Sequence, residues 1–224
     1  MSVRLTALLM LVTLINFTAV YACDESEQYD TDRDRNVADM TLRLSEYLYE
    51  IQQNTSTVQF RVDSPLGDIW VSFDDFNGHF AMIKQGVRDD TVIVDINADS
   101  LDTEAGFIGM MLRSESFFDV DKFPKMRFVG RGFEWYGNRR AILKGDLTVQ
   151  NVTHPVAFYV ELVDIEADSA GSDIITVKAS TTIKRSRFGI HTLLPIVSDD
   201  VNLYMSINAH RVDSSAYIVS RLQD

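Results

Sequence analysis

The feature that most constrains the fold is a set of three alternating apolar runs between Lys125 and Val163. Lys125–Phe133 and Arg140–Val149 flank a polar Gly-Asn turn, and this combination predicts a β-hairpin. Asn151–Pro155 indicates a second reversal, because Pro155 disfavours helix in the residue before it. Alternation resumes in Val156–Val163. Three consecutive antiparallel strands form a meander, so we expect a mostly β domain.

Similar period-two patterns run through much of the chain. An apolar residue at every second position is typical of a strand with one buried face. Eight or nine such runs with turn signals between them favour a barrel or a sandwich over an α/β fold. A chain of 224 residues has room for one such domain plus appendages. The further runs are Thr57–Asp63, Asp68–Asp74, Phe76–Gln85, Thr91–Ala98, Ile174–Arg185 and Val201–Ala209.

One segment breaks the strand pattern. Between Asp102 and Val120, apolar residues crowd together around Gly106 and Gly109 instead of alternating. Asp102 or Thr103 offers a side chain that caps a helix start, so we predict a short helix inserted between strands. Two roles stay open for it: a plug or lid over one end of a barrel, or a simple completion of the core.

The N-terminus has the layout of a targeting segment. Residues 1–22 combine one basic residue with a long uncharged apolar run, which predicts a secretory signal peptide. Cys23, the single cysteine, follows a partial lipobox and is the lipidation candidate, which would provide a membrane tether. Soluble secretion after cleavage and an uncleaved anchor are the alternatives. In each case we expect an exported protein, periplasmic or tethered to a membrane of the cell envelope.

The remaining boundaries follow from composition. Residues 23–45 form an acidic tether and lead-in, residues 46–212 form the barrel, and residues 213–224 form a C-terminal tail. A single cysteine excludes an intramolecular disulfide or a thiolate metal site in the domain.

Charge and motifs argue against nucleic-acid binding and against catalysis. The net charge of −12 opposes a phosphate backbone. The four histidines lack metal-ligand spacing, and no nucleophile elbow or phosphate-binding loop is present. Asp199 and Asp200 are neighbours in an expected strand, so their carboxylates point to opposite faces. We therefore predict a non-enzymatic protein without catalytic residues, metal or cofactor.

Several short stretches, in order between Tyr47 and His210, resemble the YceI-like family of exported lipid-binding barrels. Each stretch is a weak motif alone, and together they are fairly specific. They are Ser100–Thr103, Leu112–Val120, Phe123–Pro124, Phe128, Lys144–Val149, Asn151–Val156, Arg187–Gly189 and Val197–Val201.

This resemblance implies an all-β, eight-stranded antiparallel lipocalin-like barrel with the short helical insertion near one end. Its expected ligand is a long-chain amphiphile: a polyisoprenoid, an isoprenoid quinone or a fatty amide. Arg113, beside Phe117 and Phe118, is the head-group candidate. The residues expected to line the barrel or its mouth are Phe60, Val71, Phe73, Phe80, Val94, Ile108, Met111, Leu112, Phe117, Phe118, Phe128, Leu143, Leu147, Phe188, Leu203 and Met205.

Two functional classes stay open at this point. A barrel of about eight strands is just wide enough to enclose one slender molecule. Moving a methylene group from water into the barrel gains about 0.8 kcal/mol, whereas moving it from a bilayer gains almost nothing. The first class is therefore a lipid carrier that exchanges its lipid with membranes. The second is an interaction protein whose barrel is fully packed and whose outer face or loops bind a protein partner. A second copy of the chain, in a homodimer, is a further candidate partner. Filled and hollow barrels share the same periodicity, so the pattern does not separate them.

Overall fold

The computed structural model describes residues 48–81, 92–167 and 173–212. The predicted signal peptide, Cys23, the whole of the tether and the C-terminal tail lie outside these residues. Within the described ranges, no helix combines the length and apolar character needed to cross a bilayer. The strands are β1 (Leu48–Ile51), β2 (Thr57–Val62), β3 (Ile69–Phe73), β4 (Phe76–Ala81), β5 (Val92–Asn97), β6 (Leu101–Asp102), β7 (Lys125–Trp135), β8 (Arg140–Val149), β9 (Val152–Ala167), β10 (Asp173–Lys184) and β11 (Asp200–Arg211).

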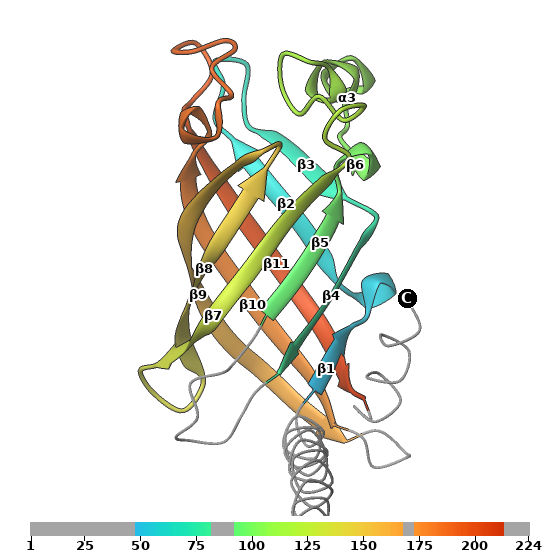
Figure 1. Cartoon of the computed structure of the whole chain (residues 1–224), viewed down its shortest axis with the longest axis vertical. Coiled ribbons are helices and arrows are strands. Elements are labelled where there is room, and N and C mark those ends of the chain that lie inside the picture. Colours follow the sequence, from blue (N-terminus) through green and yellow to red (C-terminus); the bar gives the residue numbers. More distant parts are fainter. Residues whose placement is uncertain (1–47, 82–91, 168–172, 213–224) are drawn as a thin grey trace, which may run out of the picture. The chain divides into compact units, whose positions relative to one another are not determined.

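These segments form one antiparallel sheet that closes into a barrel of eight strands (Figure 1). Three of the eight are interrupted and therefore appear as the pairs β1/β2, β3/β4 and β5/β6. The first break is the 3-10 turn Gln53–Thr55 and the third is the 3-10 turn Ala98–Ser100. The barrel closes where β11 pairs with both β1 and β2. The predicted fold class is confirmed.

The hairpin predicted at the centre of the chain is confirmed, whereas the second reversal is shorter than expected. β7 and β8 pair from Arg127 to Trp135 across a register shift. The turn after β8 centres on Gln150, whose φ is +55°, and β9 already begins at Val152. The prediction that the reversal extends to Pro155 is wrong. Because β10 pairs with β9 only from Tyr159 onward, the missing N–H of the proline faces no ladder on that side.

The core fills the inner faces of the strands, and one glycine shapes it. Gly145 lies opposite Gly130 in the β7–β8 pair, and the Phe128 ring covers Gly145 so closely that a Cβ there would overlap it. Phe128 also packs edge-to-face on Phe158 at 5.1 Å between ring centroids. The ring therefore lies against the barrel wall and does not extend across the interior.

The predicted helical insertion is α3, Gly106–Arg113. Its N-cap is Ala105, which makes no side-chain capping bond, so the expected cap by Asp102 or Thr103 is wrong. Gly109 and Leu112 face inward, whereas Phe107 and Met110 are exposed. The helix thus lies at one end of the barrel, beside β6 (Figure 1).

Candidate functional site

The barrel encloses a cavity of about 230 Å³ whose wall is almost wholly apolar. Each of the eight strands contributes to this wall, because the inward positions of every alternating run converge on it. At the α3 end, Ile108, Met111 and Leu112 line it on one side, and Leu193 and Val197, from the loop before β11, line it on the other. The barrel is therefore hollow.

Most of the residues predicted to line the barrel lie on the cavity wall. Val71 is the exception: it is buried but does not line the cavity. It pairs with Phe60 and lies two positions from Phe73, and the Phe118 ring packs edge-on against both of those aromatic rings, which leaves the smaller Val71 behind them. The predicted residues on the wall are Phe60, Phe73, Phe80, Val94, Ile108, Met111, Leu112, Phe117, Phe118, Phe128, Leu143, Leu147, Phe188, Leu203 and Met205.

The volume suits a slender, flexible group. The cavity of about 230 Å³ is smaller than most ligand pockets. Pockets for drug-sized ligands run from about 300 to 1,000 Å³. Met111, Met126 and Met205 line the wall, and unbranched thioether side chains repack readily around an irregular guest. A longer chain therefore requires these side chains to move, or leaves part of its length outside.

Arg113 does not lie on the cavity wall. Its Nε donates to a carboxylate oxygen of Asp99 at 2.9 Å, and its Nη2 donates to the carbonyl oxygens of Asp99 at 3.0 Å and Leu101 at 2.5 Å. These bonds tie the C-terminal turn of α3 to the chain just before and within β6. Arg113 thus holds the helix in place, and its guanidinium already has partners other than a ligand.

The arginine that does reach the cavity is Arg185, which sequence reasoning missed. It is 6% exposed, and its guanidinium donates to four carbonyl oxygens of the loop before β11, at 2.7 to 3.1 Å. Burial lowers the pKa of Arg185, against the opposing charge of Asp199. The available signal was periodicity: Val177, Ala179 and Ile183 face the cavity, and Arg185 is the next inward position. The four acceptors are Ile190, Thr192, Val197 and Ser198.

The two neighbouring carboxylates after this loop have separate structural roles. Asp199 accepts hydrogen bonds from the Ser186 backbone N–H at 2.9 Å and hydroxyl at 2.8 Å, whereas Asp200 pairs with Lys184 at 2.8 Å. Desolvation alone would raise the pKa of Asp199, but the bonds from Ser186 and the nearby cations outweigh it and lower that pKa. Hydrogen bonding by Asp200 raises the pKa of Lys184. The two carboxylates therefore do not share a proton.

Two further contacts hold the end of the barrel together. The Thr192 hydroxyl donates to the Ser116 carbonyl at 2.8 Å, which joins the loop before β11 to the segment after α3. His154 packs edge-to-face on the buried Phe188 at 5.3 Å. Within the part of the chain that the structure describes, no cluster of His, Cys, Asp or Glu has the arrangement of a metal site.

A closed barrel of eight antiparallel strands around an apolar cavity defines a lipocalin-like barrel protein. Residues 49–209 match the YceI-like domain family. The chain is 32% identical over 169 residues to a UPF0312 protein of Pectobacterium atrosepticum, covering 75% of this chain and 87% of that protein. The chain therefore belongs to the YceI-like family.

Solved structures share the fold. BcnA of Burkholderia cenocepacia matches with a TM-score of 0.64 and 18% identity, over 70% of this chain and 98% of BcnA. A polyisoprenoid binding domain from Saccharophagus degradans, implicated in plant cell wall breakdown, matches with a TM-score of 0.58 and 12% identity, over 75% of this chain and all of that domain. At these identities the likeness concerns the fold.

Proposed function

We propose that the barrel binds the chain of a long amphiphilic lipid of the isoprenoid type, without catalysis, and carries it between membranes of the cell envelope. The observation that carries this proposal is the hollow, almost wholly apolar interior. Membership of the YceI-like family and the fold shared with a polyisoprenoid binding domain support it. The apolar N-terminal run supports export, and Cys23 is the proposed point of attachment to a membrane.

The distribution of polar groups determines how such a ligand would lie. The wall presents almost no polar surface, and the guanidinium of Arg185 is occupied by carbonyl oxygens of the protein. A buried head group would lack hydrogen-bond partners, which costs several kcal/mol by general estimates of roughly 2–7. The tail therefore occupies the interior, and the head group stays at an opening. A tail gains little over its state in a bilayer, so the protein exchanges lipid with membranes and does not sequester it permanently.

Native mass spectrometry of residues 24–224, purified from the source organism without detergent, tests the proposal. We expect a long-chain adduct that denaturation releases. Two neighbouring β10 positions offer a matched pair, because successive side chains in a strand point to opposite faces. Ala179→Phe fills the cavity and removes the adduct, whereas Ser180→Phe places the same ring outside and retains it. A mass without adduct, unchanged by incubation with a lipid extract, would refute lipid carriage and favour an interaction protein.

A further inference from the structure

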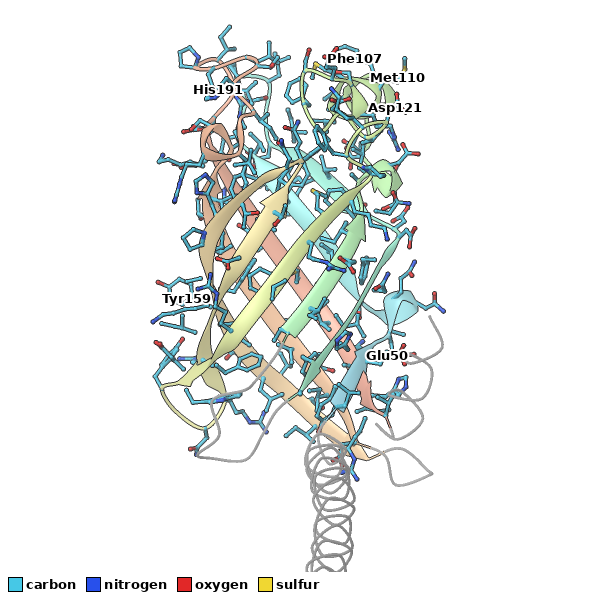
Figure 2. The ribbon with its side chains drawn as sticks, in the orientation of Figure 1. Glu50, Phe107, Met110, Asp121, Tyr159 and His191 are labelled. Carbon is cyan, nitrogen blue, oxygen red and sulfur yellow. The ribbon has the colours of Figure 1, made fainter. Side chains whose placement is uncertain are left out.

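The helix α3 is apolar on two sides, but the barrel covers only one of them. Ile108, Met111 and Leu112 line the cavity, whereas Phe107 and Met110 are 74% and 75% exposed (Figure 2). A helix that is apolar all round normally buries its whole surface. Within the described residues, the outer side of α3 remains uncovered, and exposed apolar surface of this kind marks an interaction site.

Exposed apolar side chains occur on two other loops at the same end of the barrel. Leu193 and Ile196, in the loop before β11, are 43% and 67% exposed, and this loop meets the segment after α3 through the Thr192–Ser116 bond. Leu66, in the β2–β3 turn, is fully exposed. Figure 1 shows α3 and the loop before β11 at one end. We name Leu66, Phe107, Met110, Leu193 and Ile196 the apolar rim.

The rim is continuous with the cavity. Leu193 is both exposed and part of the cavity wall, and on α3 the exposed Phe107 and Met110 alternate with the cavity-lining Ile108 and Met111. A lipid tail that leaves the interior at this end therefore passes directly between rim side chains. A surface that covered the rim would receive the tail without exposing it to water.

The charges around the rim specify which lipid surface fits it. Arg113 pairs with Asp99 and Lys122 with Asp119, so these two cations already have partners. Glu104 flanks the helix, and Asp121 lies at the same end (Figure 2). Such carboxylates repel anionic head groups, which attract basic segments. The rim therefore suits a zwitterionic surface better than an anionic one.

We propose that the apolar rim docks the barrel onto a zwitterionic phospholipid bilayer, with the end of the cavity facing the lipid. This inference rests on the proposed lipid-binding function and adds the surface through which lipid is exchanged. The rim side chains project from the helix α3 and from two separate loops, and a fluid bilayer accommodates such projections without a complementary surface. Phe107 and Met110 insert among the acyl chains, as the apolar face of an interfacial helix does.

Flotation with phosphatidylcholine vesicles tests the docking, with residues 24–224 as the protein. The strands of the barrel and the buried core residues that the structure describes lie within residues 48–211, and omission of residues 1–22 removes an apolar segment that would itself enter the vesicles. We expect the double variant Phe107→Ser and Met110→Ser to reduce the vesicle partition coefficient at least about tenfold, since burial of each side chain contributes strongly to partitioning. Added phosphatidylglycerol does not strengthen binding of the unmodified protein.

A matched control removes exposed apolar surface from the barrel wall. Tyr159 and Ile165 of β9 are 64% and 57% exposed and lie outside the rim, so Tyr159→Ser with Ile165→Ser leaves vesicle binding unchanged. Equal binding by the rim variant and this control would overturn the docking proposal. Dimerisation through the rim would also overturn it. Such a dimer would appear as a mass that doubles with rising protein concentration in the unmodified protein but stays monomeric in the rim variant.

The docking and the lipid-binding proposals fail in different measurements. Neither Phe107 nor Met110 lines the cavity, so the rim variant retains its lipid adduct in native mass spectrometry performed without vesicles. If the rim variant carries the lipid adduct and binds vesicles as well as the unmodified protein does, the docking proposal alone is refuted. Vesicle binding by a protein that never carries an adduct refutes lipid carriage alone.

Discussion

Replacement of Arg185 by methionine tests whether one buried cation holds the loop that closes the cavity. The guanidinium bonds four loop carbonyl oxygens at 2.7 to 3.1 Å, and each hydrogen bond to a charged group contributes about 1.5–3 kcal/mol. Loss of the charge also removes a desolvation cost of several kcal/mol. The net expectation is a loss of about 3–5 kcal/mol in the free energy of unfolding, because four carbonyl oxygens lose their donors at a cost of about 1–3 kcal/mol each and the recovered desolvation energy offsets part of this. A domain in the middle or upper part of the usual range of about 5–15 kcal/mol still folds after this loss.

Urea denaturation measures this loss as a lower midpoint at an unchanged slope. Amide hydrogen exchange adds a local reading: Leu194 and Val197, whose N–H groups bond within the loop, lose protection before the strands do. Arg187→Met is the control, because Arg187 is exposed, and its effect stays within about 0.5 kcal/mol. Arg185→Lys retains the charge without the planar fork and is intermediate. A cost below about 1 kcal/mol for Arg185→Met, with loop protection unchanged, would refute this reasoning.

Two further predictions concern the barrel wall. In Gly145→Ala the new methyl group overlaps the Phe128 ring and a neighbouring backbone oxygen, which lowers the free energy of unfolding by at least about 1–3 kcal/mol. The control is Gly106→Ala, whose Cβ meets no atom within 4 Å and which leaves stability unchanged or higher. Equal thermal melting temperatures for the two variants would contradict the packing argument. Hydrogen bonds from Arg127 at 2.6 Å lower the pKa of Asp95 from 3.8, so this pair adds stability above pH 3.8 that disappears as the pH falls through the lower folded pKa. Urea titrations of Arg127→Met therefore show a loss in the free energy of unfolding of about 1 kcal/mol or less at neutral pH and no loss at strongly acidic pH. A loss that persists in acid would show that the charge pair is not responsible.

The sequence predicted most of the wall because the wall obeys a local rule. Phe60, Leu203 and Met205 lie on one face by strict alternation, and a residue at an inward position of a closed barrel meets the cavity. The same rule gives no warning of the breaks in three strands, such as Gln53–Thr55. Those breaks depend on how one strand bends to pair with its neighbours at both ends of the barrel.

The two arginines show where local patterns stop being informative. The partners of Arg113 are Asp99 and Leu101, more than ten residues earlier in the chain, and no periodicity links a helix end to a turn before it. The inward position of Arg185 could in principle be predicted, because it continues the alternation of inward-facing residues in β10. An arginine on an apolar face, however, contradicts the expected composition of a core. Four carbonyl oxygens around the guanidinium account for its place, and these come from a loop whose path no local pattern predicts.

Pairing of the first and last strands of the barrel has a consequence for how the chain is made. Tyr49 lies opposite Arg211 and Val62 opposite Val201, so the ring cannot close until β11 has been synthesised. Until then β2 lacks its β11 neighbour, and an unpaired strand edge invites pairing with another chain. Contacts between residues so far apart in sequence also form slowly. Ring closure is thus expected to be a late step in folding, and a nascent chain remains an open sheet for most of its synthesis, which leaves time for a chaperone to bind it.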